Sequence, residues 1–200
     1  MKNIVIGTAG HIDHGKTTLI KALTGRETDT LAEEKKRGIS INLGFTYFDL
    51  PSNKRAGIVD VPGHEKFIKN MLAGASGLDM VLFVVGADEG VMPQTVEHLD
   101  ILSFLDIKNG IIVLTKCDTV DKEFIELVKE DVREKVKGTF LENADILEVD
   151  SISKKGIDVL INKIDKMSNE IECNNENSPA RLNIDRVFSV KGFGTVITGT

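Results

Sequence analysis

Residues 10–17 read Gly-His-Ile-Asp-His-Gly-Lys-Thr: a glycine, four residues, and then Gly-Lys-Thr. The apolar stretch 3–6 before this motif predicts a buried strand, and residues 18–23 after it predict a helix. A strand, a loop and a helix in this order are the setting of a phosphate-binding P-loop. The two glycines let the backbone curl so that N–H groups point at phosphate oxygens, and the helix N-terminus adds partial positive charge.

The P-loop supplies most of the expected nucleotide contacts. The candidate ligands there are Asp13, His14, Gly15, Lys16, Thr17 and Thr18. Lys16 can reach the β- and γ-phosphates, and the hydroxyl of Thr17 can bind Mg²⁺. The histidines at positions 11 and 14 are expected to shape the loop. The alternative is a glycine-rich turn that caps an ordinary helix. The motif indicates a nucleoside triphosphate and leaves the base open.

The composition narrows the class of protein. The 200 residues carry 25 Lys and Arg against 31 Asp and Glu, a net charge of −6. The chain as a whole is therefore no electrostatic partner for nucleic acid, and RNA contacts would need a local basic patch or parts outside these residues. Cys117 and Cys173 lack metal-ligand spacing, as expected in a reducing cytoplasm. No signal peptide and no membrane-spanning apolar run is visible, so we expect a cytoplasmic protein without membrane contact.

Strand and helix patterns alternate along most of the chain. Strands are expected at 2–7, 43–50, 56–61, 80–85, 110–114 and 146–149, and helices at 16–24, 65–75, 93–105, 122–136 and 157–171. The turn at 51–55 joins its two flanking strands into an antiparallel hairpin. The expected fold class is α/β, a mostly parallel six-stranded sheet with helices on both faces. Ligands of such sheets bind at the carboxyl ends of the strands.

The domain organisation changes near residue 172. Residues 1–171 are expected to form the nucleotide-binding domain, and the polar segment 172–180 is typical of a linker. Residues 181–200 contain two β-type runs around a turn. Because a lone two-stranded hairpin is marginally stable in water, we expect this stretch to be the truncated start of a second, β-barrel domain.

Guanine specificity is expected from residues 115–118, Thr-Lys-Cys-Asp, which follow a predicted buried strand. The Asp118 carboxylate can accept hydrogen bonds from N1–H and N2–H₂ of guanine, and adenine offers no such pair of donors. The stem of Lys116 can lie along the base, and the Thr115 hydroxyl can make part of a bridge to the P-loop. Ser151 and Ile152 follow the last sheet strand, where a backbone N–H could meet guanine O6.

Residues 60–64, Asp-Val-Pro-Gly-His, follow the second strand of the hairpin. Asp60 can hold Mg²⁺ through a water, and the N–H of Gly63 can contact the γ-phosphate. Ser40, at the end of a long charged loop, offers a hydroxyl for Mg²⁺ and an N–H for the same phosphate. Together with Thr17, these residues predict a Mg²⁺ site that senses whether the γ-phosphate is present.

His64 comes one residue after this sensor. Hydrolysis of a triphosphate needs a water oriented in line with the bond that breaks, and an imidazole can hold that water. We therefore interpret His64 as catalytic; the alternative is a solvent-facing residue at a helix start. Ile12 and Ile39 are the candidate gate that screens His64 from the water until a partner moves it. His98, on a predicted helix, is expected to be a surface or packing residue.

The motifs at 10–18 and 60–64 resemble those of translational GTPases related to elongation factor Tu. Residues 60–75 and 184–200 are similar to the family of bacterial selenocysteine-specific elongation factors. Thr115 departs from that larger group, because elongation factor Tu carries Asn at this place. The likeness covers essentially the whole chain.

The resemblance implies a P-loop GTPase that binds GTP or GDP with Mg²⁺ and delivers selenocysteinyl-tRNA to a ribosome decoding a recoded UGA. It implies ribosome-stimulated hydrolysis, and recognition of the tRNA and of an mRNA hairpin through domains outside these 200 residues. Asp13 matches a position where relatives can hold a monovalent cation. The GTPase domain is expected to be monomeric.

Two alternatives remain open at this point. The chain could belong to a general aminoacyl-tRNA or initiator-tRNA carrier of the elongation factor Tu type. It could also be a nucleotide-gated assembly module without tRNA, although the β-type runs after residue 181 favour a tRNA carrier.

Overall fold

A single six-stranded sheet organises the first part of the chain. The computed structural model describes residues 3–28, 34, 40–64, 77–105, 107–171, 182 and 184–199. The strands are β1 (Ile4–Ala9), β2 (Gly44–Asp49), β3 (Arg55–Asp60), β4 (Met80–Gly86), β5 (Gly110–Thr115) and β6 (Ile146–Glu148). Their order is β2-β3-β1-β4-β5-β6; β2 is antiparallel to β3 and all other neighbours are parallel. The expected α/β fold class is confirmed.

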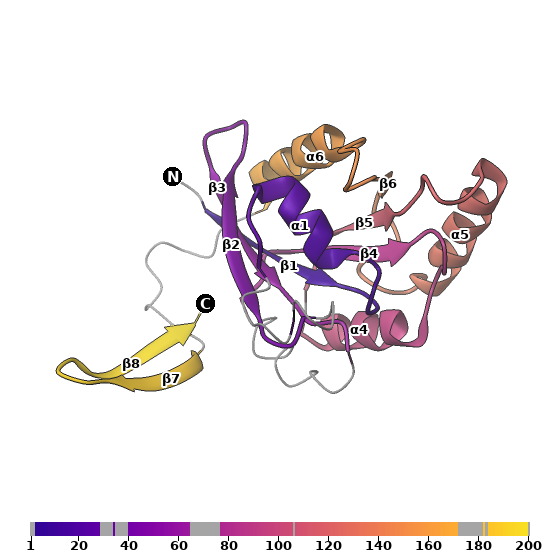
Figure 1. Cartoon of the computed structure of the whole chain (residues 1–200). Coiled ribbons are helices and arrows are strands. Elements are labelled where there is room, and N and C mark those ends of the chain that lie inside the picture. Colours follow the sequence, from indigo (N-terminus) through magenta and orange to yellow (C-terminus); the bar gives the residue numbers. More distant parts are fainter. Residues whose placement is uncertain are drawn as a thin grey trace.

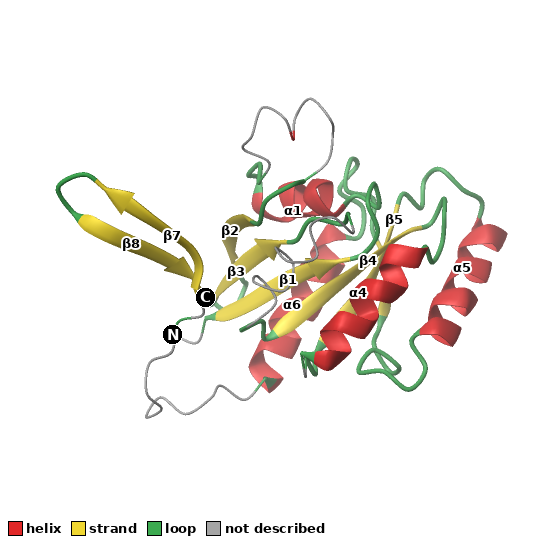
Figure 2. Ribbon diagram, turned by 90° about the horizontal axis from the view of Figure 1, so that it is seen from below, coloured by secondary structure: helices red, strands yellow, loops and turns green. Residues whose placement is uncertain are grey.

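Helices cover both faces of the sheet (Figure 1). They are α1 (Lys16–Thr24), α4 (Pro93–Phe104), α5 (Lys122–Lys135) and α6 (Ile157–Glu170). One apolar cluster joins the sheet to α1 and α6, and a second joins it to α4 and α5. In Figure 2, α4 lies in front of the sheet. The helix expected at 65–75 and the linker expected at 172–180 lie outside the described residues.

Burial explains why the strands take their places. All seven residues of β4 and all six of β5 are buried, as continuous apolar runs require in central parallel strands. Strand β2 alternates between buried and exposed positions, which suits its place at the edge of the sheet. Strand β1 extends to Ala9, beyond the predicted end at residue 7, because Ala9 still pairs with Phe83 of β4.

The parallel order brings five loops to one edge of the sheet. The loops after β1, β3, β4, β5 and β6 all leave from carboxyl ends of strands, and β1 lies between β3 and β4. The P-loop and residues 60–64 are therefore neighbours although far apart in sequence. Strands β7 (Ile184–Val190) and β8 (Gly194–Gly199) form a separate antiparallel pair, where two β-type runs were expected. Of the helices in the described part of the chain, none is long and apolar enough to cross a bilayer.

Candidate nucleotide-binding site

A pocket of about 300 Å³ opens at the carboxyl edge of the sheet, beside the P-loop. Its lining consists of Ile12, Asp13, Gly15, Lys16, Thr17, Thr18, Lys21, Glu27, Ser40 and Gly63. Eight of these ten were expected from the sequence to bind nucleotide or metal or to act as the gate. Lys21 and Glu27 were not, and they form an ion pair with 2.7 Å between Nζ and Oε2. The pocket thus collects three segments that are separate in sequence: the P-loop, the residue before β2 and the residues after β3.

The three predicted Mg²⁺ ligands meet beside this pocket, which Thr17 and Ser40 line. Thr17 Oγ1 lies 2.9 Å from Ser40 Oγ and donates to Asp60 Oδ2 across 2.8 Å. Two hydroxyls and a carboxylate are hard oxygen donors, which Mg²⁺ prefers over nitrogen and sulfur. The residues present therefore fit a Mg²⁺ ion that completes its shell with water and phosphate oxygens.

Asp60 is buried among hydroxyl groups that the sequence did not indicate. Besides Thr17, Thr28 Oγ1 donates to Oδ2 across 2.7 Å, and Thr8 Oγ1 donates to Oδ1 across 3.0 Å. Asp60 is 1% exposed, and this burial raises the pKa of its carboxyl, while the three hydroxyl donors and Lys16 lower it. The hydroxyls thus partly compensate a buried carboxylate and fix its orientation.

Ser40 is held by an acidic side chain of the preceding loop. Glu34 is buried, and its Oε1 accepts from the N–H groups of Ile41 and Asn42 across 3.1 and 3.0 Å. These bonds fix the backbone next to Ser40, which places its hydroxyl against Thr17. Ile39, the predicted partner of Ile12 in the gate, lies outside the described residues.

Lys16 occupies the centre of the P-loop. Its Nζ donates to the carbonyls of Gly10 and His11 across 3.0 and 2.5 Å. Burial lowers the pKa of Lys16 to about 8, against a smaller upward influence of Asp60. A Cβ at Gly63 would stand 2.3 Å from Lys16 Nζ and 2.8 Å from Ile12 N, so only glycine lets the segment after β3 approach the P-loop this closely.

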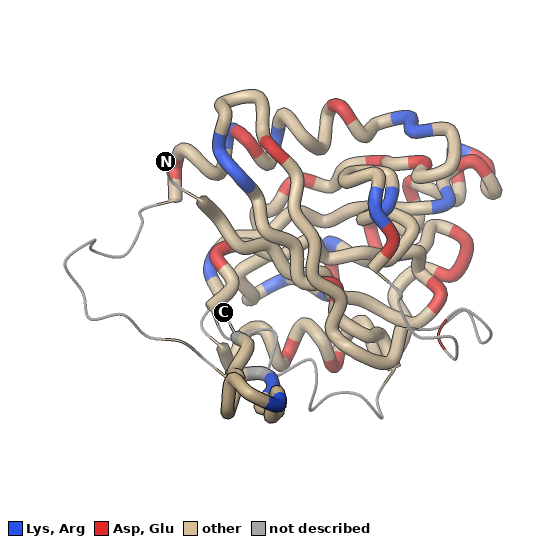
Figure 3. Tube along the Cα trace, turned by 60° about the vertical axis from the view of Figure 1, so that its left-hand side comes forward, with Lys and Arg blue, Asp and Glu red and all other residues tan. Residues whose placement is uncertain are grey.

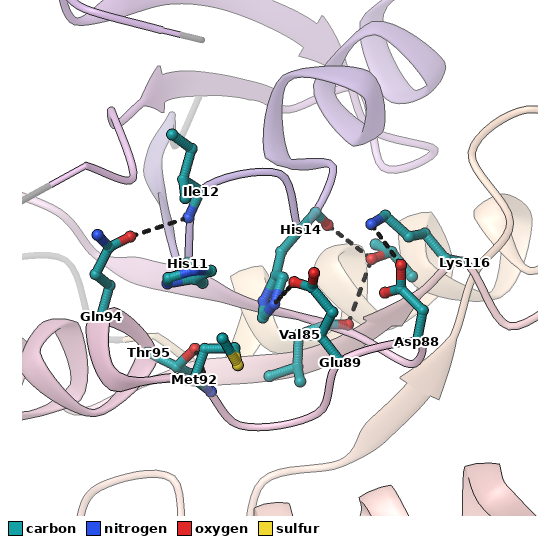
Figure 4. Close-up of polar contacts among 12 residues, drawn as sticks. His11, Ile12, His14, Val85, Asp88, Glu89, Met92, Gln94, Thr95 and Lys116 are labelled. Atoms are coloured by element: carbon teal, nitrogen blue, oxygen red, sulfur yellow. Dashed lines mark hydrogen bonds and ion pairs between the residues drawn. The ribbon is translucent and has the colours of Figure 1, made fainter. Parts of the chain in front are cut away.

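The P-loop is braced from α4 and from the loop before it (Figure 4). The N–H of Gly10 donates to His98 Nδ1 across 3.1 Å, and the N–H of Ile12 donates to Gln94 Oε1 across 3.3 Å. His98 is 1% exposed, and burial lowers its pKa to about 3, so the ring is neutral and can accept. His98 is thus a packing residue, which was one of the two roles expected from the sequence. Its hydrogen bond to the P-loop could not be inferred from its position in the sequence.

His14 is the other buried histidine of this region. It is fully buried, its ring centroid lies 5.1 Å from that of His11, and burial lowers its pKa to about 4. Its Nε2 lies 3.4 Å from Glu89 Oε2, a contact between a carboxylate and a ring that is neutral at pH 7. The neutral ring of His14 therefore packs under the P-loop, in line with the expected shaping role.

The base loop is tied to the P-loop through Thr115. Its Oγ1 donates to the carbonyl of His14 across 2.7 Å, with Val85 O at 3.3 Å. Lys116 has a left-handed backbone (φ 58), and its Nζ pairs with Asp88 Oδ2 across 2.7 Å. Asp118 is exposed. The predicted base-reading side chain thus stands at the surface, on a loop whose first residue is anchored in the interior.

The loop after β6 faces the same region. The N–H groups of Ile152 and Ser153 donate to the Asp150 carboxylate across 2.9 and 3.2 Å. The Ile152 N–H is therefore already engaged, and its side chain is 86% exposed. His64 is half-buried directly after Gly63, and Asp13 is exposed with a left-handed backbone (φ 62).

The chain matches a known family over most of its length. The family model of the elongation factor Tu GTP binding domain matches residues 1–170. Over 197 residues, 98% of the chain, it is 53% identical to the selenocysteine-specific elongation factor of Desulfomicrobium baculatum, of which it spans 31%. It is 45% identical over the same length to the protein of that name from Escherichia coli K12. The translation initiation factor 2 subunit gamma of Thermococcus onnurineus is 40% identical over 95% of this chain, which spans 52% of it.

Solved structures agree with these relatives. A crystal structure of bacterial selenocysteine-specific elongation factor EF-Sec superposes with a TM-score of 0.91 at 48% identity, covering 100% of this chain and 34% of the other. Elongation factor SelB from Methanococcus maripaludis, in complex with the GTP analogue GppNHp, gives a TM-score of 0.85 at 36% identity, covering 100% of this chain and 41% of that one. The chain spans about a third of the length of the selenocysteine-specific factors that it matches. It belongs to the family of the elongation factor Tu GTP binding domain, and its enzyme class is GTPase.

Proposed function

We propose that this chain is the GTP-binding and GTP-hydrolysing part of an elongation factor that delivers selenocysteinyl-tRNA to the ribosome at recoded UGA codons. The observation that carries the proposal is its 53% identity to a selenocysteine-specific elongation factor over 98% of its length. The pocket at the P-loop supports the GTPase part, because residues suited to phosphate and Mg²⁺ line it together.

In this proposal the base is guanine, read by Asp118 through the N1–H and N2–H₂ groups. Lys116 lies along the base, and Thr115 connects the base loop to the P-loop through the His14 carbonyl. Because Asp150 engages the N–H of Ile152, we assign the contact to guanine O6 to the N–H of Ser151. Asp13, Gly15, Lys16, Thr17 and Thr18, which line the pocket, surround the phosphates.

The γ-phosphate end of the site acts as the switch. Thr17, Ser40 and Asp60 would hold Mg²⁺, which when bound neutralises charge on the β- and γ-phosphate oxygens. The Gly63 N–H contacts the γ-phosphate, and loss of that phosphate on hydrolysis releases residues 60–64 and the loop that ends at Ser40. His64 orients the attacking water. Ile12 and Ile39 form the gate, and Asp13 is the candidate ligand of a monovalent cation.

The partners follow from the same proposal. The ribosome stimulates hydrolysis, and the tRNA and mRNA hairpin are bound by segments beyond the 200 residues described. Acidic and basic residues are interspersed along the described chain (Figure 3), and the net charge of −6 gives no general attraction to RNA. We place the protein in the cytoplasm, with its GTPase domain acting as a monomer.

A second function is favoured by a specific observation. The 40% identity to an initiation factor 2 gamma subunit fits a carrier of initiator tRNA. Binding of the full-length protein to selenocysteinyl-tRNA, seryl-tRNA and initiator tRNA separates the two. A clear preference for selenocysteinyl-tRNA is expected, and a preference for initiator tRNA would favour the second function.

The enzymatic part is tested on this chain directly. We expect slow hydrolysis of GTP and none of ATP, followed as phosphate release. His64→Ala should lower the rate constant of hydrolysis at least tenfold while leaving the affinity for GDP unchanged, because a water-orienting group acts only after binding. Equal hydrolysis of ATP and GTP, or an unchanged rate constant in the variant, would contradict the proposal.

A further inference from the structure

The loop between β4 and α4 contacts both loops that the proposed function uses. This loop, residues 87–92, follows the carboxyl end of β4. The N–H of Ala87 donates to the carbonyl of Thr115 across 2.9 Å, and Asp88 pairs with Lys116 across 2.7 Å. The next residue, Glu89, approaches His14 of the P-loop. Figure 4 shows Asp88 and Glu89 side by side, one directed at Lys116 and the other at His14.

The Asp88 carboxylate is fitted into place. A Cβ at Gly86 would stand 2.6 Å from Asp88 Oδ1 and 3.1 Å from the His14 ring, so the absence of a side chain there leaves room for both groups. The N–H of Gly90 donates to the carbonyl of Gly86 across 2.8 Å, which closes a tight turn around Asp88. The orientation of Asp88 is therefore fixed by the backbone on both sides.

Lys116 is held at both ends. Its backbone has φ 58, a conformation that lysine adopts only where surrounding contacts impose it, and its carbonyl accepts from Thr119 N and Oγ1. Its ammonium is bound to Asp88, and the side chains of the pair are 32% and 31% exposed. The four-carbon stem between these anchors thus has little rotamer freedom left to lose when a base binds beside it.

We propose that Asp88 is a positioning residue for guanine nucleotide binding: it fixes the Lys116 side chain so that the stem forms one wall of the base site. The inference rests on the proposed function, which assigns the base to this loop. Asp88 itself does not touch the nucleotide. When Asp88 is removed, the Lys116 side chain is no longer held in place. The entropic cost of ordering its stem then opposes binding, so the nucleotide dissociates faster.

The molecule contains an ion pair that serves as a matched control. Asp49 and Arg55 lie 2.9 Å apart, at the end of the β2–β3 hairpin opposite to Asp60. This pair is more exposed, at 63% and 53%, and is remote from the proposed site. An exposed ion pair of this kind contributes little to stability. Asp49→Ala therefore removes a carboxylate and an ion pair without affecting the base loop.

The test is the dissociation rate of a fluorescent GDP from the full chain, measured by chase with excess GDP. We expect Asp88→Ala to release it roughly fivefold faster, the size of effect for a half-exposed, preorganising ion pair. Asp88→Glu should recover most of the loss, and Asp49→Ala should release at the unchanged rate. In a double-mutant cycle, Asp88→Ala should not increase the dissociation rate further once Lys116→Ala is present.

A base-analogue readout separates positioning from a general structural role. Inosine diphosphate lacks the 2-amino group that Asp118 would bind, but it keeps the purine face. Asp88→Ala should weaken GDP and inosine diphosphate by the same factor, whereas Asp118→Ala should reduce the preference for GDP. The melting temperature of nucleotide-free Asp88→Ala should match that of Asp49→Ala.

Two failures are distinguishable. If the unchanged chain does not retain GDP, the guanine site itself is wrong. If it retains GDP, release from Asp88→Ala at the unchanged rate, or an additive double-mutant cycle, overturns the role of Asp88 alone.

Discussion

The two halves of the nucleotide site are built differently. The phosphate half consists of the P-loop with Asp60 and His98, and the base half consists of residues 115–118 and 150–153. In the phosphate half, Lys16 is 7% exposed and Asp60 and His98 are each 1% exposed. In the base half, Asp118 is exposed and Ile152 is 86% exposed.

The difference shows where the fold places its buried polar groups. Lys16, Asp60 and His98 in the phosphate half are fixed by hydrogen bonds before any ligand binds, which reduces the entropic cost of binding. The base half depends on two anchors, the Thr115 hydroxyl and the Asp88–Lys116 pair. Substitutions in the phosphate half should therefore disturb folding and binding together, and those at exposed positions of the base half, such as Asp118, should disturb binding alone.

The largest expected effect comes from comparing two aspartates. Asp60→Ala leaves the buried hydroxyls of Thr8 and Thr28 and the half-buried hydroxyl of Thr17 without their shared acceptor, so the free energy of unfolding should fall by about 3 kcal/mol. Asp118→Ala, at an exposed position, should change it by less than about 0.5 kcal/mol. Urea denaturation of the nucleotide-free chains measures both. Equal losses in the two variants would remove the distinction between the halves.

The next largest effect is expected for the hydrogen bond between α4 and the P-loop. His98→Leu leaves the buried N–H of Gly10 without an acceptor and should lower the free energy of unfolding by about 2 kcal/mol. His98→Asn, whose amide oxygen can accept, should recover part of that loss. Denaturation of the two variants checks this, and a leucine variant as stable as the asparagine variant would show that the bond is unimportant.

The pH dependence of binding should reveal Lys16. Burial lowers its pKa to about 8 in the free protein, and bound phosphate favours the charged form. Between pH 7 and pH 8 Lys16 is already protonated in the free protein, so the affinity for GDP should stay constant. Above pH 8 the free protein loses a proton that the complex keeps, so the affinity for GDP should fall by up to about tenfold per pH unit. Calorimetric titration with GDP at each pH measures this affinity. Asp118→Ala should keep the same profile, and affinity that stays constant to pH 9.5 would contradict the account.

The stability of the nucleotide-free chain should change in the opposite sense. Because the folded pKa of Lys16 lies below the ordinary value of 10.5, the unfolded chain binds more protons between pH 8 and 10.5. The contribution of Lys16 to the free energy of unfolding therefore rises with pH across that window.

The smallest effect is expected at the connection between the halves. Thr115→Val keeps the shape and removes the hydroxyl that donates to the His14 carbonyl, which should cost about 1 kcal/mol of stability. Thr119→Val is the comparison variant, because it removes a hydroxyl bond to the Lys116 carbonyl of the same loop that is exposed rather than buried. Thermal unfolding of the two variants measures the difference, and equal melting temperatures would mean that the Thr115 bond does not join the loops.

The sequence predicted the parts of the site that are contiguous. The spacing of Gly10, Gly15 and Lys16 is fixed by the geometry of one loop, and Asp118 follows a recognisable buried strand. The supporting groups could not be predicted, because they come from other elements. Thr8 is 52 positions from Asp60, and His98 is 88 positions from Gly10.

The supporting residues also lack a local signal. A threonine in β1 or a histidine in α4 has many possible neighbours until the strand order is known, and only the pairing of β1 between β3 and β4 brings them to the site. The β-sheet itself was predictable because β4 and β5 are continuous apolar runs. The end of β1 was not, since Ala9 has a low strand propensity and Gly10 of the P-loop motif follows it directly.

The most direct test of the account is a titration of Asp118→Asn with GDP and xanthosine diphosphate. In the proposed site Asp118 reads the base, and an independent, preformed half binds the phosphates. An asparagine amide can donate to the xanthine 2-oxo group, which replaces the guanine amino group. The variant should therefore lose most of its affinity for GDP and bind xanthosine diphosphate nearly as tightly as the unchanged chain binds GDP. Loss of both nucleotides, or undiminished binding of GDP, would contradict it.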